Sequence, residues 1–137
     1  MSARIALALA VFTLVLTAGA TAATHGKPGR YNGHTAQRMA NSTKHYRFTF
    51  VVSRGKVIRM AFTSVNRCRD GSLLVVRQIG FPPRKVGSRG RFSFKGFATT
   101  VMGRLSGRHA SGSFTDVTHG CRSGRVTFRA TLGARAG

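Results

Sequence analysis

Residues 46–64 read Tyr-Arg-Phe-Thr-Phe-Val-Val-Ser-Arg-Gly-Lys-Val-Ile-Arg-Met-Ala-Phe-Thr-Ser. In the first half, Phe48, Phe50 and Val52 alternate with mostly polar residues. Alternation with period two is typical of a β-strand that buries one of its faces. Arg54-Gly55 follows, and a dipeptide of this kind is typical of a tight turn. The segment is therefore predicted to form a β-hairpin.

The same period continues along the chain. In the second half of the predicted hairpin it places Ile58, Met60 and Phe62 on one face. Further strands are predicted at 73–79, which is rich in β-branched residues, and at 91–95, 97–105, 110–117 and 126–132. Turn signals recur about every 8 to 12 residues, so we predict an all-β fold, an antiparallel sandwich or small barrel of about seven to nine strands. Interior glycines such as Gly103 and Gly112 indicate bulges or a close approach of the backbone.

The N-terminus has the three parts of a secretory signal peptide. Arg4 precedes an apolar run of twelve residues, 5–16, and Ala20-Thr21-Ala22 fits the rule for cleavage. A membrane anchor is the alternative, but spanning the hydrocarbon takes about 20 apolar residues. We predict that residues 1–22 are a signal peptide and that the protein is secreted, either free or associated with the cell envelope.

Two parts are predicted after the signal peptide. Residues 23–43 are polar and weakly patterned, so we expect a flexible N-terminal segment with a short edge strand near Tyr31. Residues 44–137 are expected to form a single β domain, since they are too few for two ordinary domains.

The chain has two cysteines, Cys68 and Cys121. In an oxidising compartment two thiols usually pair, so one disulfide is expected. Closing the loop of 54 residues between them would stabilise the domain by about 4 kcal/mol on the chain-entropy model. A free reactive thiol and half of a metal site are the alternatives, and no Cys-x-x-Cys spacing favours the second.

The mature chain carries, in this order, Tyr31-x-Gly33-x-Thr35, Cys68-x-Asp70-Gly71, Gly90-x-Phe92-x-Phe94, Gly103-x-Leu105-x-Gly107-x-x-Ala110-x-Gly112-x-Phe114 and Cys121-x-Ser123-Gly124-x-Val126-x-Phe128-x-Ala130. The order resembles that in a group of small exported β-proteins of high-GC Gram-positive bacteria. The resemblance implies export, a β-rich domain and a bridge between Cys68 and Cys121. It implies no catalytic residues, because the group has no established activity.

The charge balance is the strongest chemical signal in the sequence. The chain has 23 Lys and Arg residues against two carboxylates, Asp70 and Asp116, which gives a formal net charge of +21. So few carboxylates exclude most acid–base enzymes and disfavour oxygen-rich Ca²⁺ or Mg²⁺ sites. Arginine outnumbers lysine 18 to 5. A GC-rich genome would explain that ratio, but it does not explain the scarcity of Asp and Glu.

Several arginines lie at solvent-facing positions of the predicted strands. These are Arg47, Arg91 and Arg129, with Arg59 and Arg77 as further candidates. Guanidinium groups bind phosphate, sulfate and carboxylate bidentately. The leading hypothesis is therefore a secreted, non-catalytic basic domain that associates with anionic surfaces or polymers. The expected partners are anionic cell-wall polymers, lipid headgroups, or nucleic acid bound without sequence specificity.

A small-ligand binder with an apolar cavity is the first alternative. Its cavity would be lined by Phe48, Phe50, Phe62, Phe92 and Phe94, as small barrels can hold one ligand. The same rings would also form an ordinary hydrophobic core, and that explanation is favoured.

A hydrolase is the second alternative. It would use Asp116 and His119 with a nearby nucleophile, Ser111 or Ser113. Nothing in the spacing makes these side chains converge, and no Gly-x-Ser-x-Gly motif occurs. No catalytic residue is therefore predicted.

The five histidines are scattered, without the spacing of a metal site. We expect them on the surface, and the alternative is a copper or nickel site at His25 and His34. No metal ligand and no cofactor are predicted.

Processing of the N-terminus is directly testable. We expect the exported chain to begin at Ala23 or Thr24, because the small residues before these positions fit the cleavage rule. Mass spectrometry of material recovered from the medium measures this, and an exported chain that retains Met1 would contradict it.

Overall fold

The computed structural model describes residues 26–133, so the predicted signal peptide, its cleavage site and His25 lie outside the described residues. Ten strands and one short 3-10 helix form within this range, and no helix there is long or apolar enough to cross a bilayer. The elements are β1 (Gly29–Arg38), β2 (His45–Ser53), β3 (Lys56–Arg67), β4 (Leu73–Gln78), β5 (Arg84–Lys85), η1 (Ser88–Gly90), β6 (Arg91–Gly96), β7 (Thr99–Ser106), β8 (His109–Thr118), β9 (Cys121–Arg122) and β10 (Val126–Leu132).

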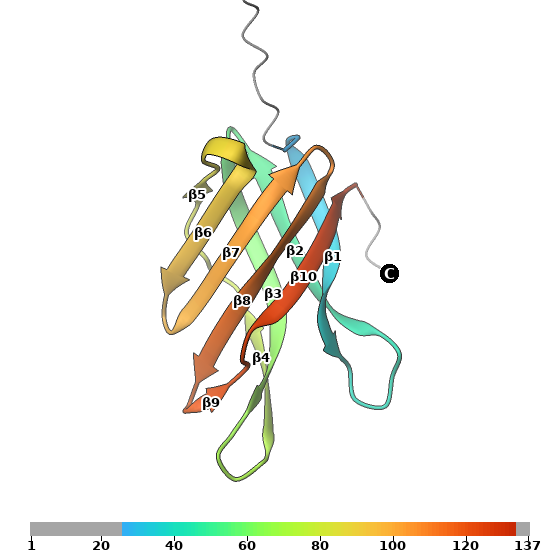
Figure 1. Cartoon of the computed structure of the whole chain (residues 1–137), viewed down its shortest axis with the longest axis vertical. Coiled ribbons are helices and arrows are strands. Elements are labelled where there is room, and N and C mark those ends of the chain that lie inside the picture. The colour runs from blue at the N-terminus through green and yellow to red at the C-terminus, as the bar shows by residue number, and fades with distance from the viewer. Residues whose placement is uncertain (1–25, 134–137) are drawn as a thin grey trace, which may run out of the picture.

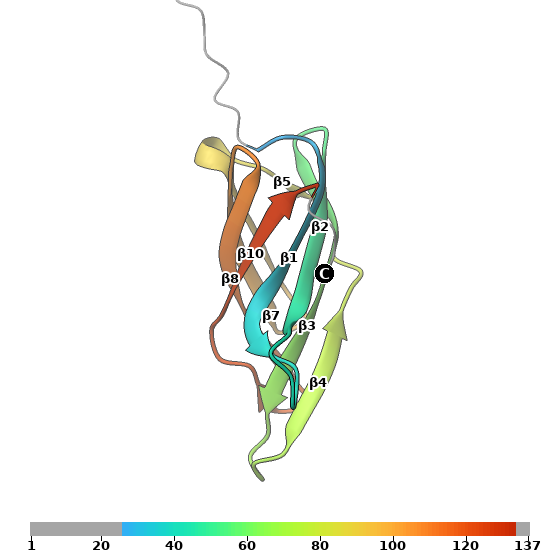
Figure 2. The same ribbon diagram turned by 90° about the vertical axis from the view of Figure 1, so that its right-hand side faces the viewer.

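The strands form one antiparallel sheet that closes on itself. Their order is β10-β1-β2-β3-β9-β8-β7-β6, and β10 also pairs with β8, so β10, β1, β2, β3, β9 and β8 make a closed barrel of six strands. β6 and β7 continue the sheet beyond β8, while β4 and β5 pair with β3. Figure 1 shows β6, β7, β8 and β10 in front of β2 and β3, and Figure 2 shows the two walls from the side. The prediction of an all-β fold is confirmed.

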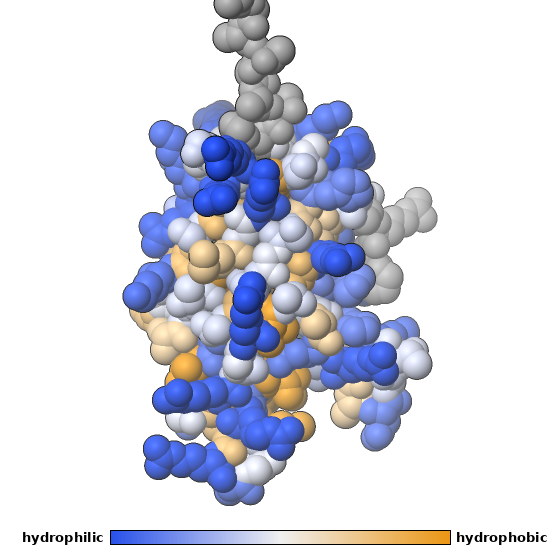
Figure 3. Space-filling model, viewed as in Figure 1, coloured by the Kyte–Doolittle hydropathy of each residue, from blue (hydrophilic) through white to orange (hydrophobic). Residues whose placement is uncertain are grey.

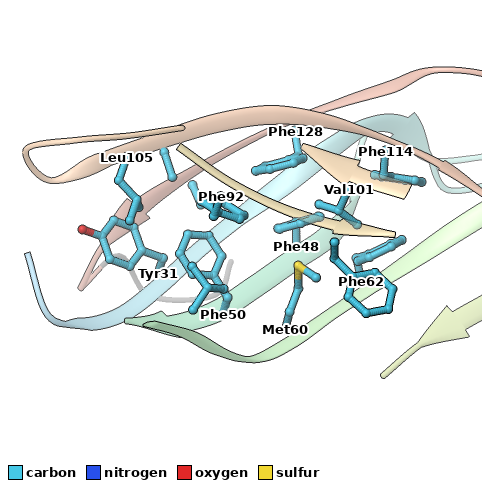
Figure 4. Close-up of a cluster of buried hydrophobic side chains, with 14 of the residues drawn as sticks. Tyr31, Phe48, Phe50, Met60, Phe62, Phe92, Val101, Leu105, Phe114 and Phe128 are labelled. Carbon is cyan, nitrogen blue, oxygen red and sulfur yellow. The ribbon is translucent and has the colours of Figure 1, made fainter. Parts of the chain in front are cut away.

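Stacked aromatic rings fill the space between the two walls. The ring of Phe48 on β2 lies parallel to that of Phe128 on β10, with 3.7 Å between the centroids. Phe62 on β3 and Phe114 on β8 flank Phe48 at 5.1 and 6.3 Å. Figure 4 shows these rings between the strands of both walls. Because each ring comes from a different strand, a single stack holds four strands together.

The five phenylalanines that could have lined a ligand cavity belong to this core. All five are buried, and each packs against at least one other aromatic ring. A cavity beside Phe92 and Phe94 measures about 10 Å³, which is the volume of about one water molecule's probe sphere. In residues 26–133 these rings therefore leave no ligand-sized space among themselves.

The glycines predicted inside strands mark close contacts with aromatic rings. Gly103 of β7 lies directly opposite Gly112 of β8. A Cβ atom at Gly103 would overlap the ring of Phe92, and one at Gly112 would lie 2.7 Å from Cζ of Phe128. The prediction of close approach is confirmed, and neither position is a break in the β7–β8 register.

The expectation for residues 23–43 is wrong in their described part. β1 is a ten-residue strand in the interior of the sheet, paired with β10 on one side and β2 on the other. The ring of Tyr31 is fully buried and stacks on Phe50 at 4.9 Å. Gly33 and Thr35 take the next inward positions, so the apolar alternation that identifies a buried strand is weak here. The first described strand of the β domain therefore begins at Gly29, upstream of residue 44.

The predicted hairpin is formed by β2 and β3, but the expected face of β3 is wrong. Val57, Met60 and Phe62 are buried, whereas Ile58 is only partly buried. Arg59 has a φ of 49°, and the register with β2 shifts there, as in a β-bulge. The extra residue moves the inward position from Ile58 to Val57.

Cys68 and Cys121 form the predicted disulfide, with their Cα atoms 4.1 Å apart, slightly nearer than the about 4.4–6.8 Å typical of disulfides. The bond connects the loop after β3 to β9. The disulfide therefore reinforces the barrel where two neighbouring strands share the fewest pairs, because β9 pairs with β3 only at Arg67 and Arg122.

Removing this bond is expected to destabilise the domain. Replacing Cys68 and Cys121 together by Ala should lower the free energy of unfolding by about 2–5 kcal/mol, because the unfolded chain regains loop entropy. Urea denaturation measures the change. Dithiothreitol should destabilise the wild-type chain and leave the double variant unaffected, and an unchanged midpoint in the double variant would contradict the prediction.

Candidate anion-binding groove

A row of cations crosses the outer face of the wall formed by β6, β7, β8 and β10. Arg91 of β6 lies directly opposite Arg104 of β7, and Arg104 lies opposite Ser111 of β8. Ser111 in turn lies opposite Arg129 of β10. Residues that face each other across an antiparallel pair project from the same side of the sheet, so these four side chains form one line at right angles to the strands.

The same line continues onto the neighbouring wall. Arg129 lies opposite His34 of β1, and His34 lies opposite Arg47 of β2. Neighbouring strands are about 4.8 Å apart, so the row from Arg91 to Arg47 covers about 24 Å. We call these six residues the arginine row.

The outer face around the row is hollowed into an open groove of about 1090 Å³. Its floor carries small hydroxyl side chains, and among residues 26–133 the one large apolar side chain exposed on it is Met102. The hydroxyl residues are Ser93, Thr100, Ser111, Ser113, Thr115 and Thr127. Arg84, Lys85 and Arg125 add cations at its margin. Figure 3 shows this face, with hydrophilic side chains around paler surface.

The groove lies in a strongly positive field. All 21 Lys and Arg residues in the range 26–133 are exposed. Three cross-strand pairs even place two cations directly opposite each other, and they are Arg91–Arg104, Arg67–Arg122 and Lys56–Lys85. Like charges in this position repel each other, so a bound anion between them would relieve the repulsion.

The sequence-predicted arginines fall into two groups. Arg91 and Arg129 line the groove, and Arg47 extends the row two strands beyond it. Arg59 is the bulge residue of β3, and Arg77 lies on β4 opposite Thr63, both outside the groove.

Arg104 was missed by the sequence prediction, although its signal was present. In β7 the side chains of Val101 and Leu105 are buried. Arg104 precedes Leu105 directly, so the period-two alternation of a strand places its side chain on the solvent side. His34 was missed as a member of the row because its strand, β1, was predicted only as a short edge element.

Asp116 of β8 lies on the inner side of the barrel and is 1% exposed. Its Oδ2 accepts hydrogen bonds from Ser64 Oγ at 2.8 Å, Asn66 Nδ2 at 2.7 Å and Thr118 Oγ1 at 3.1 Å. Its Oδ1 accepts from Gln78 Nε2 at 3.0 Å and Thr99 Oγ1 at 2.7 Å. These donors come from β3, β4, β7 and β8, so the carboxylate is the centre of a polar cluster that connects both walls.

Burial raises the pKa of Asp116, but the side-chain hydrogen bonds, first among them that from Asn66, outweigh it and hold the pKa below the usual value of 3.8. Asp116 is thus ionised at neutral pH although its five partners are all neutral.

The hydrolase alternative needs Asp116 beside His119 and a serine. His119 is exposed in the turn between β8 and β9, and none of the five bonds to the carboxylate comes from it. Ser111 and Ser113 project into the outer groove, on the opposite side of β8. In the described chain these residues are not brought together as a catalytic triad.

Two histidines approach each other on the outer surface. The rings of His34 and His45 are 5.4 Å apart, and His45 Nδ1 donates a hydrogen bond to the Thr35 carbonyl. Among residues 26–133, no three His, Cys, Asp or Glu side chains gather in a way that could hold a metal ion.

Comparison with protein-family models, with curated proteins and with solved structures found no match to this chain. The resemblance to exported β-proteins therefore stays a prediction.

The Asp116 cluster predicts a specific pH dependence. Asp116→Asn replaces an acceptor oxygen by an amide NH₂ group, which would face the hydrogen-bond donors that now surround the carboxylate. The free energy of unfolding should fall by about 3 kcal/mol at pH 7. Because the folded pKa is depressed, the stabilisation from Asp116 is present above the usual value of 3.8 and is lost as the pH falls below it. The difference in the free energy of unfolding between the wild type and Asp116→Asn should therefore become smaller at acidic pH.

Denaturation at a series of pH values measures this difference. Asp70→Asn is the control, because Asp70 is exposed and bonds only Ser72 in its own turn, so little change is expected at pH 7. A difference for Asp116→Asn that stays constant into acid would contradict the argument.

Proposed function

We propose that this chain is an exported, non-catalytic β domain that binds anionic polymers through the groove on β6, β7, β8 and β10. The observation that carries the proposal is the arginine row, in which Arg91, Arg104 and Arg129 line up with Ser111 across four adjacent strands. A linear polyanion would lie across the strands, along this row.

The chemistry of the groove supports a polymer with phosphate, sulfate or carboxylate groups. Guanidinium groups offer paired N–H donors that match these anions, and the serine and threonine hydroxyls of the floor can bind further oxygens. Two carboxylates cannot neutralise the cations of the chain, so counterions must come from outside.

The groove favours recognition of charge over recognition of bases. Proteins that bind single-stranded nucleic acid stack bases on exposed aromatic rings. The aromatic residues of these four strands, Phe92, Phe94, Phe114 and Phe128, are buried in the core. Binding should therefore depend on the density of negative charge and show little sequence or sugar specificity.

Export is part of the proposal. Disulfides persist mainly in oxidising compartments, and the Cys68–Cys121 bond supports an extracellular or envelope location together with the predicted signal peptide.

Charge removal from the groove should weaken polyanion binding. We expect the triple variant Arg91→Gln, Arg104→Gln, Arg129→Gln to elute from heparin at lower salt than the wild type. The slope of log K against log salt should fall by about two to three, because each neutralised site contributes about one. Since all three side chains are exposed, the fold should be unaffected.

A matched triple variant, Arg30→Gln, Arg38→Gln, Arg77→Gln, removes the same charge from exposed positions that line neither the groove nor the hollow beside the disulfide. It should retain most of the affinity. Equal weakening by the two triple variants, or no retention of the wild type on heparin or polyphosphate at low salt, would reject the groove as the binding site.

A further inference from the structure

An exposed aromatic side chain stands on a strained turn near the disulfide. Phe97 and Ala98 form the turn between β6 and β7, with φ angles of 51° and 60°. Such turns normally use Asn or Gly, because other residues are strained at positive φ. The Phe97 side chain is nevertheless 94% exposed. The packing of the barrel therefore does not account for the phenylalanine, and its ring is available for a contact outside the molecule.

Phe97 begins a row that runs around this end of the barrel. The Val117 amide donates to the Ala98 carbonyl at 3.1 Å, and Val117 lies opposite Arg122 of β9. Arg122 lies opposite Arg67 of β3, which lies opposite Leu73 of β4. Val117 and Leu73 are 37% and 60% exposed. Apolar and cationic side chains thus share one rim, drawn from five neighbouring elements.

The cations of the rim surround the disulfide. Arg67, Arg69 and Arg122 line an open hollow of about 730 Å³ together with His119 and the two cysteines. We call Phe97, Val117, Leu73, Arg67, Arg69 and Arg122 the disulfide-end rim. Figure 1 shows β9 and the β3–β4 loop at the same end of the barrel.

One carboxylate lies near this rim. Asp70 follows Arg69, and its Oδ1 accepts hydrogen bonds from the amide and the hydroxyl of Ser72. Three arginines against this single acid leave the rim positively charged.

We propose that the disulfide-end rim docks on the surface of an anionic lipid bilayer. Phe97, Val117 and Leu73 enter the interfacial region, and the three arginines bind the phosphates of the headgroups. A soluble polyanion would satisfy the arginines but leave the apolar side chains in water. A neutral bilayer would accept the apolar side chains but leave the arginines without counter-charges. An anionic bilayer satisfies both, and this proposal does not depend on the groove.

The absence of tryptophan from the sequence makes the contact directly observable. In the exported chain, Phe97→Trp introduces a single tryptophan at the proposed point of insertion. Its emission should shift to the blue with vesicles that contain phosphatidylglycerol and stay unchanged with vesicles of phosphatidylcholine alone. Met102→Trp is the matched control, because Met102 is 61% exposed on the groove floor, and its emission should not shift.

A second variant separates insertion from folding. Phe97→Asn places a residue that tolerates positive φ in the turn, so Tm should rise by about 4 °C. At the same time, association with the anionic vesicles should weaken by about tenfold, because the inserted ring is lost. Ile79→Asn, at another exposed apolar position, should leave vesicle binding unchanged. Unaltered retention of Phe97→Asn on heparin is expected, since Phe97 does not line the groove.

Two results would overturn the proposal. One is a wild-type chain that does not sediment with phosphatidylglycerol vesicles at low salt. The other is sedimentation without a blue shift at position 97, which would place the lipid contact on another face. Neither result bears on the heparin experiment, so the rim and the groove can fail separately.

Discussion

The excess of cations over carboxylates constrains every part of this molecule. With 23 Lys and Arg residues and only two acids, most cations cannot be paired inside the protein. Because a buried unpaired charge is very costly, each Lys and Arg of the described chain is exposed. The core is left to apolar and aromatic side chains, and the stack of Phe48 on Phe128 is the result. The positively charged surface and the aromatic core thus both follow from the same composition.

The one buried acid shows how the barrel is closed. β3 and β8 are bridged in the sheet only by the two-residue strand β9, which makes this the weakest side of the barrel. Two devices reinforce it. The Cys68–Cys121 bond fixes β9 covalently, and Asp116 accepts hydrogen bonds from Ser64 and Asn66 on the opposite strand. Neutral donors suit this role, since an arginine placed there would itself have to be buried.

Sequence periodicity predicted those elements whose inward positions are large and apolar. Phe48 and Phe50 identified β2, and the alternation of Val126, Phe128 and Ala130 identified β10. The full length of β1 was not predicted, because Gly33 and Thr35 hold inward positions and give no apolar alternation. At Gly33 the β10 backbone approaches so closely that no larger residue fits. The β-bulge at Arg59 was not predicted, because a bulge depends on the pairing with β2 and not on local composition. The candidate site was predictable one residue at a time, as exposed arginines. Their alignment into a row depends on register between strands distant in sequence, which no single segment encodes.

The groove and the disulfide-end rim lie in the same positive field, but the binding proposed for each should depend differently on salt. The proposed contacts between the groove and a polyanion would be charge contacts to exposed side chains, and they would weaken as the screening length falls to about 8 Å at physiological ionic strength. The rim adds Phe97 and Leu73, and burial of apolar surface is not screened by salt. Arg67 and Arg122 moreover lie opposite each other across the β3–β9 pairing, beside the disulfide that fixes it, so an anion bound between them would relieve their repulsion. On the proposal above, a surface that combines this cation pair with an exposed apolar side chain would favour a partner that is both anionic and apolar at its boundary. The groove has hydroxyls between its arginines and would favour a partner that is anionic and hydrated throughout.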